Sequence, residues 1–164
     1  MSTALTHASP PGLLKEAVRS GTIAAVIMMP VGLLFKALGL RVGHDGPKLG
    51  EFIFGSQPEP RIEALLLVQL LIIGWLSAIP LLLFWKRTSP RPVHLSDGLL
   101  YGAFYDATID AVALPSISGD ALAGQLGGSY VCPGLAVHPA FGLSIAVTAR
   151  AFGWARPIAI QALT

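Results

Sequence analysis

Two aspartates, Asp106 and Asp110, stand inside the apolar stretch GLLYGAFYDATIDAVALP, which runs from Gly98 to Pro115. In a helix, residues four apart lie on one face, so the two carboxylates would be neighbours. A charged aspartate near the centre of a membrane costs about 2.5 to 3.5 kcal/mol to insert. The large apolar residues of the stretch offset only about 3 kcal/mol in all. The pair therefore requires a compensating partner, which would be a proton, a cation, another helix or water in a cavity.

Carboxylates at this spacing favour the binding and release of a proton or a small cation. In a site of low dielectric constant both cannot ionise cheaply, so we expect the pair to share one proton unless a cationic side chain lies against it. Carboxylates inside membranes usually serve ion or proton pathways. The leading hypothesis is therefore a small proton- or cation-coupled transporter or channel that uses Asp106 and Asp110.

The other apolar segments each contribute a polar side chain to the same half of the membrane. Counted at 1.5 Å per residue from the nearer ends of their segments, these side chains lie about 6 to 10 Å deep. We therefore predict a binding site for an ion, a proton or a substrate, formed by Asp106, Asp110, Lys36, His138 and Gln69. The sequence assigns no catalytic residue and no metal ligand.

Two glycines share a helical face with the aspartates. Gly98 and Gly102 precede Asp106 at intervals of four residues, and this small-xxx-small pattern lets the backbone of a neighbouring helix approach closely. The glycines are thus predicted to pack helices together, and the carboxylates to point into the protein. Tyr101 and Tyr105 lie on an adjoining face, where we expect them to line a polar path.

The elements that hold these residues are predicted to be membrane-spanning helices. Hydrophobic residues make up 53% of the chain. Charged residues make up 12%, which is about half the charged share of a soluble domain. Apolar runs at about 20–40, 62–85, 98–114 and 134–152 can each cross a hydrocarbon core of about 30 Å as a helix. We predict an all-α integral membrane protein, one membrane domain over 1–164, with four transmembrane helices in an antiparallel bundle.

The distribution of Lys and Arg predicts the orientation of the chain. With both termini in the cytoplasm, seven basic residues fall on the cytoplasmic side and four on the other, and the cluster at 86–91 carries most of this bias. Residues 12–19 are predicted to form a short amphipathic lead-in at the headgroups. The composition favours a bacterial plasma (inner) membrane, and a net charge of +2 gives no indication of nucleic acid binding.

A second class of function is a non-catalytic membrane subunit or assembly partner of a larger complex. The acids would then meet a basic residue of another chain, and loop 41–61 would make the aqueous contact. Besides the lipid bilayer, we expect either a homo-oligomer or such a complex as the partner. The sequence requires no cofactor, but His138 or His44 could ligate a haem or a pigment. Cys132 is the one cysteine, which excludes an intramolecular disulfide.

A third class is a membrane-embedded lipid enzyme. The pattern Gly102-x3-Asp106-x3-Asp110 resembles the second half of the motif of the CDP-alcohol phosphatidyltransferases. The resemblance would imply that the aspartates bind a divalent metal ion. The first, aspartate-rich half of that motif is missing, because the chain has LFWKRTSPR in its place. This class is therefore the least favoured of the three.

Overall fold

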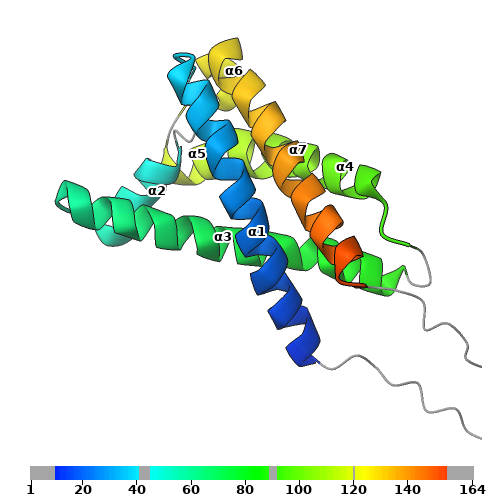
Figure 1. Ribbon diagram of the computed structural model, residues 1–164. Helices are drawn as coiled ribbons and strands as arrows, with labels where there is room; N and C mark the ends of the chain where they lie inside the picture. The colour runs from blue at the N-terminus through cyan, green and yellow to red at the C-terminus, as the bar shows by residue number, and fades with distance from the viewer. Residues whose placement is uncertain (1–9, 41–44, 89–91, 120, 155–164) are drawn as a thin grey trace, which may run out of the picture.

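Every element of the described chain is helical. The computed structural model describes residues 10–40, 45–88, 92–119 and 121–154, and these contain no strand. The elements are α1 (Pro10–Ala37), α2 (Asp45–Phe54), α3 (Glu59–Arg87), α4 (Leu95–Tyr105), the π-helix η1 (Asp106–Ala113), α5 (Leu114–Ser118), α6 (Ala123–Leu126) and α7 (Gly128–Ala151) (Figure 1). The predicted all-α class is confirmed.

Three helices are long and apolar enough to cross a membrane, and they indicate an integral membrane protein. They are Gly12–Ala37, Pro60–Arg87 and Gly128–Ala151. The predicted crossing at 98–114 is also helical throughout. However, it is divided among α4, η1 and α5, which have 11, 8 and 5 residues. None of these three elements has the length of a membrane span by itself.

The first helix begins earlier than the sequence suggested. α1 includes the predicted lead-in at 12–19, which is therefore the first part of a longer helix and not a short helix of its own. Two prolines occupy its first turn, where their missing N–H groups cost no hydrogen bond. Ala17 and Ser20 are fully buried and Glu16 is nearly so. One face of this stretch thus packs into the protein.

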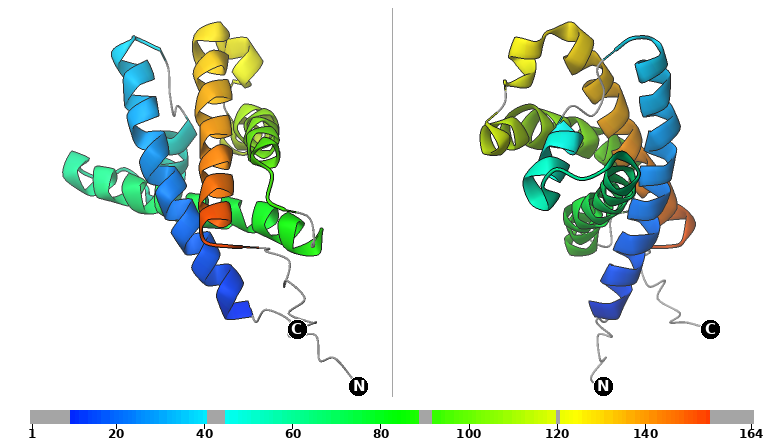
Figure 2. Two further views of the ribbon diagram at one scale, coloured as in Figure 1. Left: turned by 45° about the vertical axis from the view of Figure 1, so that its right-hand side comes forward. Right: turned by 90° about the vertical axis from the view of Figure 1, so that its left-hand side faces the viewer.

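α7 lies between α1 and α4, and it runs antiparallel to α1 (Figure 2). α3 packs against α1, which it crosses at a steep angle (Figure 1). This crossing depends on glycine, because a Cβ atom on Gly21 of α1 would lie 2.6 Å from the carbonyl oxygen of Gly74 in α3. The core beside these contacts is built from alanines and a few large side chains, among them Leu82, Trp85, Phe141 and Ile145.

At one end of the molecule, aromatic side chains connect the helices to one another. The indole N–H of Trp85, in the last turn of α3, donates to the Asp97 carboxylate in the first turn of α4 at 2.9 Å. The indole of Trp154, just after α7, donates to the carbonyl of Leu82 at 3.2 Å. The guanidinium of Arg19 in α1 lies 3.6 Å from the ring centre of Phe152. The part of α1 around Arg19 and the start of α4 therefore lie together with the ends of α3 and α7.

The segment expected to be the loop 41–61 contains a helix. α2 covers Asp45–Phe54 and contacts both α3 and α5. Gly50 permits this approach, because a Cβ there would lie 2.7 Å from the side chain of Leu66 in α3. The region therefore packs against the helices, unlike a free aqueous loop.

Candidate functional site

The contact between α4 and α7 fixes the position of Asp106. Gly98 and Gly102 lie at this contact and are buried. A Cβ on Gly102 would lie 2.6 Å from Cα of Pro139 and would also overlap the backbone of His138. The two backbones therefore touch immediately beside His138, and the next turn of the third segment places Asp106 against it. α7 of the same chain therefore covers the helical face that carries Gly98 and Gly102.

His138 and Asp106 form a hydrogen-bonded pair across this contact. Nδ1 of His138 lies 2.8 Å from Oδ1 of Asp106 and 3.1 Å from the carbonyl oxygen of Gly134. Because a backbone carbonyl can only accept, Nδ1 carries the hydrogen and donates to both oxygens. The ring nitrogen that gains or loses a proton is therefore Nε2. The imidazole is held in one orientation by groups on both helices.

Gly134 is a site residue that the sequence reasoning missed. A Cβ atom at this position would overlap Oδ1 of Asp106, so the absence of a side chain makes room for the carboxylate. The signal that could have found it is its spacing, because Gly134 lies one helical turn before His138 on the same face.

Both aspartates belong to a π-helix. In η1 the hydrogen bonds reach back five residues, as that from the Leu114 N–H to the Ile109 carbonyl does. Pro115 has no N–H group, so the carbonyl four residues earlier lacks its normal α-helical donor. The wide turn leaves Asp106 buried against α7, whereas Asp110 is half-buried and faces a cavity. π-Helical turns occur frequently at functional sites.

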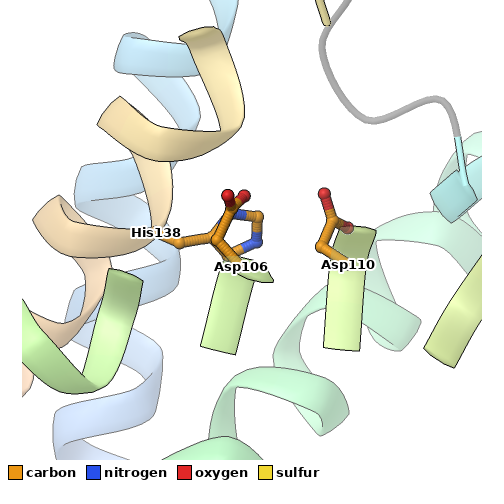
Figure 3. Close-up of side chains that lie close together, drawn as sticks. All are labelled: Asp106, Asp110 and His138. Carbon is orange, nitrogen blue, oxygen red and sulfur yellow. The ribbon is translucent and has the colours of Figure 1, made fainter. Parts of the chain in front are cut away.

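Three titratable side chains come together here. One ligand atom from each of Asp106, Asp110 and His138 lies within 4.8 Å of the other two (Figure 3). The site is therefore able to hold a cation, although the sequence assigned no metal ligand. Two ligands of a tetrahedral zinc ion stand about 3.4 Å apart. Closing the cluster on such an ion therefore requires the ligand atoms to approach one another by up to about 1.4 Å.

A cavity of about 170 Å³ adjoins the cluster. Asp110, His138 and Gln69 reach it from three different helices, and Gln69 is 7% exposed. Tyr105 also lines it, with its ring centre 5.6 Å from that of His138. Tyr101 instead donates its hydroxyl hydrogen to the carbonyl of Ser77. Ser77 and Tyr130, which the sequence reasoning did not single out, complete the polar part of the wall.

Lys36 does not join this group. It stands in the last turn of α1, its side chain is exposed, and it is not among the described residues that line the cavity. The predicted common depth is wrong for two reasons: α1 ends at Ala37, which puts Lys36 at the very end of its helix, and α7 begins at Gly128, earlier than the predicted 134, which puts His138 deeper in its helix. His138 and Gln69 each lie about 15 Å from the start of their helices at 1.5 Å per residue. His44, the other histidine considered for a haem, lies outside the described residues.

Comparisons with protein families, with curated proteins and with solved structures found no match. Function is therefore inferred from the side chains that this chain brings together.

Proposed function

We propose that the protein is a small membrane transporter or channel that binds and releases a proton or a cation at Asp106, Asp110 and His138. The observation that carries this proposal is the approach of three titratable side chains to within 4.8 Å of one another. They come from two helices and lie beside a cavity that a third helix completes with Gln69.

Charge balance explains how such a site would couple a cation to a proton. With both carboxylates ionised and His138 protonated, the cluster carries a net charge of about −1 at the standard side-chain charges. One additional proton or one bound monovalent cation makes it neutral, and a site shielded from water favours neutrality. A cation that arrives at Asp110 would therefore displace a proton, so the two would exchange one for one.

Four crossings with cytoplasmic ends are part of this proposal. The continuous segment α4–η1–α5 turns large apolar side chains outward, since Leu100 is 70%, Phe104 66% and Ile117 66% exposed, while Asp106 is only 5% exposed. This distribution suits a helical rod that faces lipid on one side and protein on the other. The composition makes a bacterial inner membrane the proposed location.

Basic residues support the proposed orientation. Lys15 and Arg19 occupy the first turns of α1, and the last turns of α3 and α7 carry Lys86, Arg87 and Arg150. The aromatic contacts described above place these helix ends together. Such a cluster of positive charges marks the cytoplasmic side.

Cys132 provides a test of the number of crossings. Its side chain is exposed near the start of α7. With four crossings and a cytoplasmic N-terminus this end of α7 faces outward. A membrane-impermeant maleimide should then label Cys132 in intact cells, and a Cys132→Ser variant should give no signal. With three crossings the same residue would face the cytoplasm, and labelling would require permeabilised cells.

Proton flux tests the proposed function. The purified protein would be reconstituted into vesicles that contain a pH-sensitive dye, and proton movement would be recorded after a membrane potential or a Na⁺ or K⁺ gradient is imposed. We expect flux above that of protein-free vesicles, because the cluster can load and release a proton. Asp106→Asn together with Asp110→Asn removes both acids and should reduce flux to the protein-free rate.

Asp97→Asn is the matched control, because Asp97 stands in the first turn of α4, away from the cavity. Asparagine can still accept the hydrogen bond of Trp85, so flux should be retained. Equal flux from the wild type and a folded double variant would contradict the proposal. A wild type that shows no flux but co-purifies with other membrane proteins would instead favour the role of a non-catalytic subunit.

A further inference from the structure

The cavity beside the cluster is large enough for an organic molecule. Its volume is about 170 Å³. An apolar cavity of about 150 Å³ in a protein interior stays dry and binds benzene. A bare metal ion or a proton would therefore leave most of this space unfilled. The volume corresponds to a compact body of benzene size that carries a short substituent.

The wall of the cavity is mainly apolar. Its polar lining residues were described above, and most of the remaining lining residues are aliphatic or aromatic, among them Met28, Leu70, Ile73, Val137 and Phe141. Apolar surface of this kind stabilises an apolar ligand, because both surfaces are removed from water on binding. A fully hydrophilic ion would gain nothing from most of this wall.

The charges at the wall favour a positive ligand. Among the described lining residues Asp110 is the one carboxylate, and none is a lysine or an arginine. The second carboxylate, Asp106, lies within 4.8 Å of Asp110 by its nearest ligand atoms. Tyr105, Tyr130 and Phe141 add aromatic rings, whose faces attract ammonium groups. Against the two acids the described part of the wall offers one imidazole, His138, and no lysine or arginine, so an organic anion would meet more acidic than basic groups.

We propose that this cavity binds a small organic ammonium ion, with its apolar body between α1, α3 and α7 and its charged group at Asp110. The inference rests on the proposed transport function and names the class of cation that the site would carry. Its charged group would lie against Asp110, with the second carboxylate, that of Asp106, within 4.8 Å.

Two probes of nearly the same shape test this inference. Benzylammonium, which is protonated at neutral pH, and ethylbenzene differ in the replacement of an NH₃⁺ group by CH₃. Binding of each to the purified wild-type protein in detergent would be measured by titration calorimetry. We expect benzylammonium to bind about 10- to 100-fold more tightly, because its charged group can hydrogen-bond to the carboxylate. Asp110→Asn should make the two affinities similar, and Asp97→Asn should preserve the difference.

The wild-type comparison decides the matter even if a variant fails to fold. Equal affinities, tighter binding of ethylbenzene, or no binding of either probe would overturn the inference. If the two probes bind alike while proton flux still depends on Asp106 and Asp110, the transport proposal stands and this inference falls. Charge-selective binding without flux above that of protein-free vesicles would overturn transport and support the cavity as a binding site.

Discussion

Alanine in place of Gly102 is expected to force α4 away from α7 and to lower the free energy of unfolding by about 3 kcal/mol or more. The added Cβ would lie 2.6 Å from Cα of Pro139 and would overlap the backbone of His138. Backbone atoms cannot rotate away as a flexible side chain can, so the effect belongs at the upper end of what overpacking costs. Unfolding in sodium dodecyl sulfate, followed by tryptophan fluorescence, would measure it.

Gly12→Ala is the matched control for this substitution. Gly12 lies in the first turns of α1, and a Cβ there would meet nothing within 4 Å. Alanine is favoured over glycine in a helix by about 1 kcal/mol, so stability should stay the same or rise. Equal unfolding curves for Gly102→Ala and the wild type would show that the close contact between α4 and α7 does not exist.

Zinc is expected to bind the cluster, and His138→Ala is expected to weaken this binding by at least about 100-fold. Loss of a group that merely supports a metal ligand costs about 10- to 100-fold in affinity, so loss of the ligand itself should cost more. Imidazole and carboxylate are both zinc ligands, and the cluster offers one of the former and two of the latter. Competition with a fluorescent zinc chelator would measure the affinity of the purified protein.

His94→Ala provides the comparison for zinc binding. His94 is the residue before the first turn of α4 and is exposed, outside the cluster. Its removal should leave the zinc affinity unchanged. If His94→Ala and His138→Ala weaken zinc equally, or if neither does, the three side chains do not act as one cation site.

The helical segments could be predicted from composition because long apolar runs have one stable conformation in lipid. Their ends were less accurate, since the sequence indicates where hydropathy changes rather than where hydrogen bonding begins. α7 starts at Gly128, although hydropathy suggested 134. This shift explains why His138 lies well inside its helix, whereas Lys36, judged to be at the same depth, stands exposed at the end of α1.

The acidic residues of the candidate site could be predicted from the sequence, but the residues and the helix geometry that position them could not. Asp106 and Asp110 stand out because charge is costly among apolar residues. Ser77 carries no such signal, since serine is common in membrane helices for packing alone. Gly134 was detectable only from its spacing, one helical turn before His138. The π-helical register of η1 was also not predictable, because 106–113 contains no glycine or proline, and Pro115 just beyond it indicates a disturbed helix without indicating a π-helix.

The π-helical segment also determines where the third helical rod can change its length. An α-helix rises 1.5 Å per residue, and a wider helix with bonds to the fifth residue advances less. Rewinding η1 into α-helix would therefore elongate the rod and turn α5 about its axis. α4 is held to α7 by Gly98 and Gly102, so the displacement would be directed toward α5 and toward α2, which packs on it. The α4 end of the rod would stay in place, and the α5 end would move along the helix axis.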